Sequence, residues 1–145
     1  MAATPYELPR HECMALLNSQ RVGRLCIVER GYPLAFPVNY RVANADGAVN
    51  IVVRALPRAA IGTYEGPASF EVDEIDLDRA SAWSLILRGE LRHATSDDHL
   101  PDTQPLVSEG RYRWRVLAVA AISGRRFSGN GPDGGFSVDW QPSEH

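Results

Sequence analysis

Two arginines that follow an apolar run are the residues of this sequence best suited to binding chemistry. The apolar run 51–53 ends at Arg54, and a second guanidinium follows four residues later at Arg58. A planar guanidinium binds a phosphate through two parallel hydrogen bonds, and the free N–H groups at the start of a helix favour the same ligand. The pair is therefore either a phosphate site or two ordinary surface charges. All 15 basic residues of the chain are arginine, so the choice of arginine over lysine here carries no weight.

Other chemistry-bearing motifs are weak. The chain has no G-x-S-x-G and no paired cysteine and histidine, and its four histidines are scattered. The acidic run 71–78 is expected to be a solvated face rather than a metal site. A literal G-x-G-x-x-G at 129–134 is followed by no helix, so it is expected to belong to a flexible tail. No catalytic residue and no metal are therefore predicted, and any redox chemistry would come from a cofactor.

Two tryptophans mark further candidate positions. Trp83 and Ser84 are adjacent in a predicted strand, so their side chains must face opposite sides. One of the two faces the interior or a partner. Trp114 is predicted to lie in the core, at an interface, or as a stacking surface for an aromatic ring.

The elements that must position these residues are mostly strands. Hydrophobic periodicity predicts a helix over 9–19 and a helix over 57–64 opened by Pro57. It predicts strands over 22–29, 34–42, 48–54, 67–76, 80–94 and 111–127. Asp46-Gly47 forms a hairpin turn, and Gly89 is expected to be a bulge or bend. The fold class is mainly β, a small antiparallel barrel over residues 1–127 with a Gly/Pro-rich tail over 128–145.

Composition excludes several classes of function. The 145 residues suit one domain, and a net charge of −3 gives no general attraction to nucleic acid or anionic membranes. The sequence has no 18-residue apolar run and no signal-peptide pattern near residue 1. Cys13 and Cys26 form no C-x-x-C and are expected to be buried free thiols, which is typical of a cytoplasmic protein.

Five short motifs in fixed order give the chain a family resemblance. They are P-V-N-Y at 37–40, V-V-R-A-L-P-R-A at 52–59, F-E-V-D-E at 70–74, W-S-x-x-x-R-G at 83–89 and I-S-G-R-R-F at 122–127. With them the chain resembles the pyridoxamine 5′-phosphate oxidase-like family of FMN-binding split barrels, in its small actinobacterial-type branch.

The resemblance implies a six-stranded Greek-key split barrel that forms a homodimer, with flavin sites between the subunits. It implies an FMN-binding oxidoreductase that transfers a hydride or electron at flavin N5 to or from an unknown small-molecule substrate. The cofactor-binding residues it implies are Pro37, Val38 and Asn39 along the ring, Arg54, Ala55 and Arg58 at the phosphate, Trp83 and Ser84 at polar contacts, and Trp114 and Arg125 on the partner's last strand.

Departures from the family pattern leave two alternatives open. Relatives commonly have Arg-Thr-x-x-x-x-Lys after the third strand, which places Ala55 at the threonine and Ala60 at the lysine. One alternative is the same fold with the deazaflavin F420, whose polyglutamyl tail would need a basic groove such as Arg111, Arg113 and Arg115. The other is a split barrel without cofactor that serves as a dimeric binding or regulatory module. The substrate-binding arginine and histidine of true pyridoxamine phosphate oxidases find no match, so that activity is not predicted.

Overall fold

A computed structural model of the chain describes residues 6–98, 100 and 112–128, and these residues form one antiparallel β-structure with two short helices. The elements are β1 (Tyr6–Glu7), α1 (Arg10–Ser19), β2 (Val22–Glu29), β3 (Tyr32–Ala45), β4 (Ala48–Ala55), α2 (Ala60–Thr63), β5 (Gly66–Asp76), β6 (Ser81–His93) and β7 (Arg113–Ser128).

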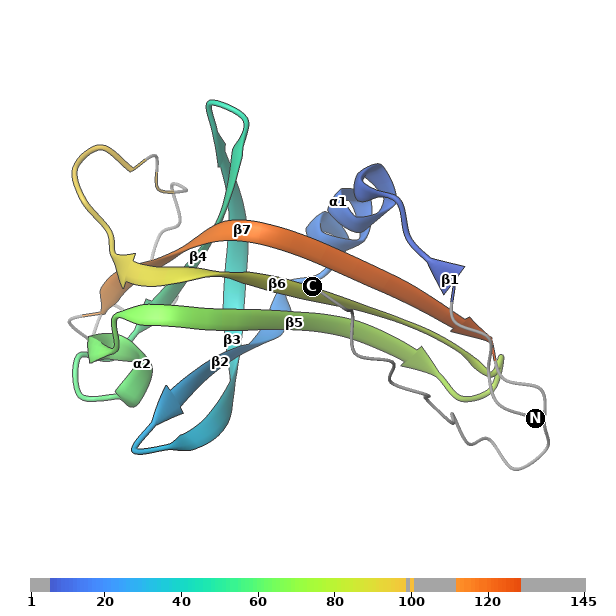
Figure 1. Cartoon of the computed structure of the whole chain (residues 1–145), viewed down its shortest axis with the longest axis horizontal. Helices are drawn as coiled ribbons and strands as arrows, with labels where there is room; N and C mark the ends of the chain where they lie inside the picture. Colours follow the sequence, from blue (N-terminus) through green and yellow to red (C-terminus); the bar gives the residue numbers. More distant parts are fainter. Residues whose placement is uncertain (1–5, 99, 101–111, 129–145) are drawn as a thin grey trace.

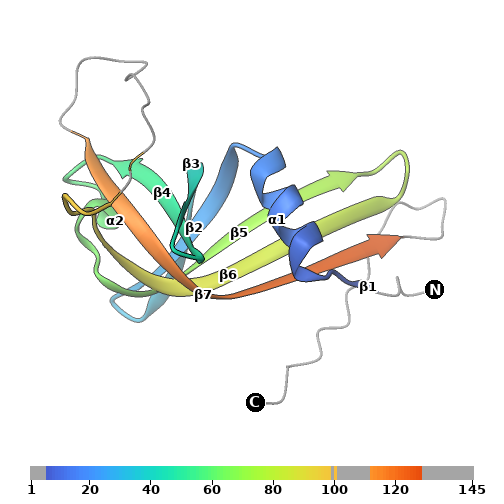
Figure 2. The ribbon, with the colours of Figure 1, turned by 90° about the horizontal axis from the view of Figure 1, so that it is seen from above.

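Six of the strands close into a ring. The order is β7-β4-β3-β2-β5-β6, and a further pairing between β6 and β7 closes it, while the two-residue β1 adds to β7. After the β2-β3-β4 meander, β5 returns to lie beside β2, which is the Greek-key arrangement. Figures 1 and 2 show the long strands β5, β6 and β7 extending beyond the part of the ring that β2, β3 and β4 complete. The predicted fold class and split barrel are confirmed.

Strict alternation of side chains builds the core. On β2 and β5 the inward positions, among them Leu25, Ile27, Phe70 and Val72, are almost fully buried, and the residues between them face outward. One face of α1 closes the core through Cys13 and Leu17. The helix can approach because β7 carries Gly124, where a Cβ would lie 2.7 Å from the Cys13 sulfur.

Three predictions about local structure have clear outcomes. The register shift between Arg88 and Gly89 confirms the predicted irregularity in β6. Cys13 is a buried free thiol as predicted, but Cys26 is only half-buried, because it lies on the outward positions of β2. The prediction that Pro57 opens a helix is wrong: residues 56–59 form a turn, and α2 begins only at Ala60.

The turn explains why α2 is so short. The N–H of Ala59 donates to the carbonyl of Leu56 at 3.0 Å, and Ala59 itself has an extended backbone. Pro57 therefore occupies the second position of a β-turn, where its fixed φ is equally favourable. The chain reaches helical geometry only for residues 60–63.

Neither described helix could cross a membrane, since α1 has ten residues and α2 four. Ser128, the first residue of the predicted tail, is the last residue of β7, and the rest of the tail with its glycine motif lies outside the described residues, as do most of the loop 96–110, His99, Arg111 and His145.

Candidate functional site

The third strand has one edge without a neighbouring strand over half its length. Residues 32–39 of β3 pair with β2, whereas only residues 40–45 pair with β4, whose last pair in this ladder is Tyr40–Val53. In the part of the chain that the structure describes, residues 33–39 therefore have a ladder partner on one side only. We call this side the open edge of β3.

The direction of the backbone groups at the open edge follows from one hydrogen bond. The N–H of Tyr40 donates to the carbonyl of Arg21 at 2.9 Å, on the β2 side. Successive residues of a strand point their N–H groups to opposite edges, so the N–H of Asn39 points to the open edge. By the same alternation positions 33, 35 and 37 point there too, but Pro33 and Pro37 have no N–H. The open edge thus keeps backbone donors only at Ala35 and Asn39, together with its carbonyls.

The ring-side candidates divide between two faces of β3. Pro37 and Asn39 are exposed and face outward, while Val38 between them packs against the core. The structure thus offers Pro37 and Asn39 as side chains, and Val38 only through its backbone.

The penultimate residue of β4 is an arginine that stacks on a tryptophan. Arg54 is in register with Trp114 of β7, and its guanidinium carbon lies 4.5 Å from the centre of the indole ring. This is the geometry of a cation–π contact. Asn39 and Arg54 are each the next residue beyond the last β3–β4 pair, Tyr40–Val53, and both alternate with buried or half-buried residues, so both have the parity of the outer face. Ala55 points inward and is buried.

The turn after β4 carries the second arginine. Arg58 is exposed between Leu56 and α2, and Ala60, which occupies the place of the family lysine, is the first residue of α2. Arg58 is therefore exposed on the outside of the barrel, whereas Arg54 is half-buried and stacked on Trp114. The side chain of Ala60 offers no polar group.

A buried arginine behind this turn is a functional candidate that sequence reasoning missed. Arg115 is fully buried, and its Nε donates to the carbonyl of Ile61 at 3.0 Å while Nη2 donates to the carbonyl of Tyr64. Burial lowers the pKa of Arg115, which the negative charge of Glu65 partly opposes. As part of a basic groove with Arg111 and Arg113, Arg115 would have to be exposed. The sequence did contain one indication of its burial. Arg115 is two residues before the apolar Leu117, so both side chains lie on the same side of the strand, and Leu117 is buried.

The remaining candidates lie elsewhere on the barrel. Ser84 is in register with Arg125 on β7 and with Asp73 on β5, and faces outward, while Trp83 is buried in the core. This confirms that Trp83 and Ser84 face opposite sides. Trp114 and Arg125 are eleven residues apart on β7, which is up to roughly 36 Å along the strand. The candidates therefore form two groups, one around Asn39, Arg54 and Trp114, and the other around Ser84 and Arg125.

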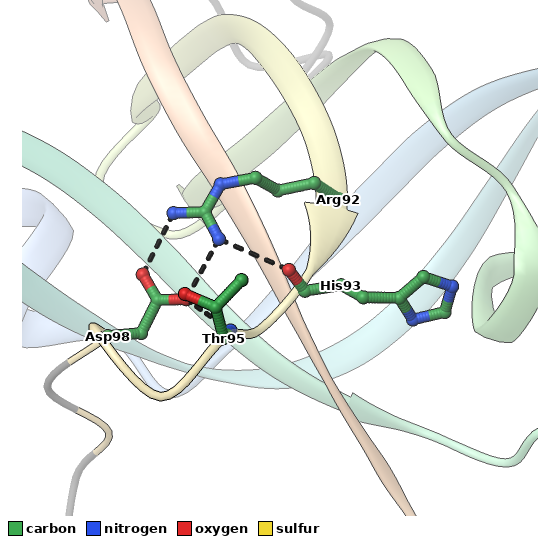
Figure 3. Close-up of polar contacts among 4 residues, drawn as sticks. All are labelled: Arg92, His93, Thr95 and Asp98. Carbon is green, nitrogen blue, oxygen red and sulfur yellow. Dashed lines mark hydrogen bonds and ion pairs between the residues drawn. The ribbon is translucent and has the colours of Figure 1, made fainter.

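A turn over residues 95–98, held by several hydrogen bonds, lies next to the group around Arg54 and Trp114. Figure 3 shows the Arg92 guanidinium facing the Asp98 carboxylate, with both contacts at 2.8 Å, and the His93 ring pointing away from them. The N–H of Thr95 also donates to Asp98, and these contacts, led by Arg92, hold the pKa of Asp98 well below its usual range. Because the N–H of Ala94 donates to the carbonyl of Trp114 at 3.1 Å, this turn is fixed beside the Arg54–Trp114 pair.

Two small pockets accompany these features, and neither is lined by a predicted cofactor residue. One of about 190 Å³ lies between the end of α1 and β3, next to Arg21 and Arg41. One of about 30 Å³ lies under the Asp97–Asp98 turn, beside Val52 and Val116.

The acidic run and the basic strand also have defined places. Arg24 of β2 contacts both Glu71 and Asp73, and its Nη2 lies 3.0 Å from the Asp73 carboxylate. Over residues 6–98, 100 and 112–128 no three His, Cys, Asp or Glu side chains gather as a metal site. Of the arginines considered for an F420 tail, Arg115 is buried and bonded to backbone carbonyls, so only Arg113 is exposed among those described.

One family model matches most of the chain. The sequence model described as pyridoxamine 5′-phosphate oxidase matches residues 9–126. An uncharacterised protein of Mycobacterium tuberculosis is 25% identical over 121 residues, which are 80% of this chain and 76% of that protein.

Solved structures from two actinobacteria share the fold. A conserved protein of unknown function from Corynebacterium diphtheriae has a TM-score of 0.73 at 23% identity, over 85% of this chain and 98% of that one. The FAD binding protein from Mycobacterium smegmatis has a TM-score of 0.73 at 23% identity, over 86% of this chain and 100% of that one. At 23% identity, the similarity to these two structures shows that the chain has the same fold, the split barrel.

Proposed function

Because the chain belongs to the pyridoxamine 5′-phosphate oxidase family, we propose that it binds a flavin nucleotide and works as a flavin-dependent oxidoreductase. The observation that carries the proposal is the open edge of β3, which runs up to Asn39, one residue before the last β3–β4 pair, Tyr40–Val53. The edge provides hydrogen-bonding groups for a flat heterocycle, and Arg54, which follows Val53 on β4, provides a cation on the outer face of the barrel.

The residues present fit the FMN portion of a flavin. The flavin ring carries both donors and acceptors along one edge, and the N–H of Asn39, its side-chain amide and the edge carbonyls match both kinds. Arg54 and Arg58 would hold the phosphate, each through as many as two hydrogen bonds. Ala55 and Ala60 have no polar side-chain atom, so these two guanidiniums would replace the threonine and lysine of relatives.

The proposal concerns the part that FMN and FAD share. The similar structure from Mycobacterium smegmatis is named as an FAD binding protein, and FAD contains the whole of FMN. When bound, either nucleotide supplies hydride or electron transfer. The chain's own part would be to orient the ring with Asn39, to hold the phosphate with Arg54 and Arg58, and to fix Arg54 with Trp114.

The spacing of the two candidate groups supports a homodimer. A compact pocket of 1,000 Å³, which is large for a small ligand, is only about 12 Å across. Eleven residues of extended strand along β7, roughly 36 Å, separate Trp114 from Arg125, about three times the width of such a pocket, which argues against both lining it in a single chain. Two copies can, if one provides Asn39, Arg54 and Trp114 and the other provides Ser84 and Arg125.

The test is the cofactor carried by the purified protein. We expect a yellow protein that releases FMN or FAD on denaturation, identified by mass spectrometry, and a dimeric mass by light scattering. If the protein is colourless, titration with FMN, FAD and F420, each followed by fluorescence, replaces the first measurement. A protein that binds none of the three refutes the proposal, and one that prefers F420 over both flavins assigns the cofactor to the deazaflavin class.

A second candidate function is a split-barrel dimer without cofactor that binds or regulates a partner. The observation that favours it is Ala60, where the side chain at the start of α2 offers nothing to a phosphate. The two candidates differ in a simple way. A cofactor-free module would bind no flavin, even after Ala60→Lys.

A further inference from the structure

Two consecutive residues of β7 hold the two ends of the segment that follows Val53. Trp114 faces outward and stacks on Arg54, where the segment begins. Arg115 faces inward and bonds to the carbonyls of Ile61 and Tyr64, where it ends. Arg58 lies between these two attachments.

The segment needs such an attachment because α2 is not stable by itself. It has four residues, and neither the N-cap Ala59 nor any other side chain caps its first N–H groups. A single helical turn is far below the length at which a helix is stable alone. The last carbonyls of a helix also need partners outside the helix, and Arg115 supplies donors at this end.

Burial of Arg115 is hard to explain by core stability. A buried guanidinium pays a large desolvation cost, and apolar side chains of similar size often serve a core as well or better. One of its donor groups, Nη1, is buried and has no hydrogen-bond partner among the described residues. The bonds that Arg115 does make go to the segment that carries Arg58.

We propose that Arg115 is a positioning residue for phosphate binding: it fixes residues 56–64 from inside the barrel so that Arg58 and Arg54 converge on one phosphate. The proposal rests on the proposed flavin function. Arg115 itself does not touch the cofactor, since its side chain is fully buried.

The test compares ligands that differ only in the phosphate. Arg115→Met removes every donor and keeps an apolar side chain of similar length, whereas Arg115→Lys keeps a charge and one donor group. The matched control is Arg126→Met, the same change at an exposed position of β7. Each full-length variant is titrated with FMN and with riboflavin, and hydrogen exchange is measured without ligand for residues 58–64 and for the β2–β3 hairpin.

We expect Arg115→Met to weaken FMN binding about ten- to hundredfold, the factor that one hydrogen bond to a charged group typically supplies. Riboflavin affinity should stay within about twofold, and exchange should become faster in residues 58–64 but not in β2–β3. Arg115→Lys should recover part of the FMN affinity, and it replaces the methionine variant if that one does not fold. The control variant should match the wild type.

Equal losses for FMN and riboflavin, or equally faster exchange in both regions, would show that Arg115 only stabilises the barrel and would overturn the proposal. Unchanged affinity and exchange would overturn it as well. If the wild type binds no flavin, the proposed function fails, and the exchange measurement alone still decides whether Arg115 holds residues 56–64.

Discussion

Substitution of Gly62 by alanine separates helix propensity from packing, because the two predict opposite signs. Gly62 lies in α2 and its φ is not in the left-handed region, so an alanine has no backbone strain there. Propensity and the lower entropy of the unfolded chain favour alanine in a helix by up to about 1 kcal/mol. On those grounds alone Gly62→Ala should stabilise the protein.

The structure predicts destabilisation instead. A Cβ at position 62 would lie 2.1 Å from the carbonyl oxygen of Leu56, whereas ordinary contacts begin at 3.4 Å. Backbone must therefore move by about 1.3 Å, the difference between these two distances. The same oxygen accepts the hydrogen bond from Ala59 that defines the turn, so this bond weakens or breaks. Overpacking against backbone costs about 1–3 kcal/mol, and a lost hydrogen bond costs about 1 kcal/mol.

We therefore expect Gly62→Ala to lower the free energy of unfolding by about 2 kcal/mol, which corresponds to roughly 6–8 °C in Tm for a chain of this size. Urea denaturation followed by tryptophan fluorescence measures it. Thr63→Ala is the control, since Thr63 is the next residue of α2 and is exposed, and it should change stability by less than about 0.5 kcal/mol. A Gly62→Ala protein as stable as the wild type, or more stable, would refute the described packing of this turn.

Three further predictions concern the phosphate turn and the core. Arg58→Ala should weaken FMN binding about tenfold by equilibrium dialysis; unchanged binding in a protein that holds FMN would remove Arg58 from the site. Ala60→Lys should raise FMN affinity in the same assay, and no gain would favour the cofactor-free module. Burial raises the pKa of Tyr40 to about 12, above its usual value near 10, so the neutral phenol is favoured in the folded protein. The stabilisation from the neutral Tyr40 phenol is complete below about pH 10 and is lost as the pH rises toward 12. The free energy of unfolding of the wild type, measured by urea denaturation, should therefore fall by about 2 kcal/mol relative to that of Tyr40→Phe over this interval. If the unfolding free energies of the two proteins change equally with pH, the raised pKa is contradicted.

The strands could be predicted from the sequence because each carries its own periodicity. Residues 22–29 have the same bounds in the structure as in the prediction, and 67–76 differs by a single residue from Gly66–Asp76. Alternation also placed Trp83 and Ser84 on opposite faces. These are local properties, decided by which side chains can share one side of a sheet.

The environment of Arg115 could not be predicted, because it depends on residues far away in the sequence. Its carbonyl partners at Ile61 and Tyr64 are more than 50 positions earlier and meet it only when β4 and β7 pair. The start of α2 was misplaced for a related reason. Pro57 suits both the first turn of a helix and the second position of a β-turn, so the residue itself does not decide between them.

The open edge of β3 exists because β3 is longer than β4, and two prolines disfavour the pairing of another strand with this edge. β3 has 14 residues and β4 only eight, so β4 cannot cover β3 along its whole length. An uncovered edge normally invites another strand, with aggregation as the risk. Four residues of β3, at positions 33, 35, 37 and 39, direct their backbone nitrogen to this edge, and two of them are Pro33 and Pro37. A strand added there would therefore find no N–H donor at two of the four positions. The donors that remain, at Ala35 and Asn39, are too few for a strand and enough for one small heterocycle. The same two prolines therefore disfavour a protein strand as the occupant of this edge, and leave its best donor, Asn39, at the end where Arg54 lies.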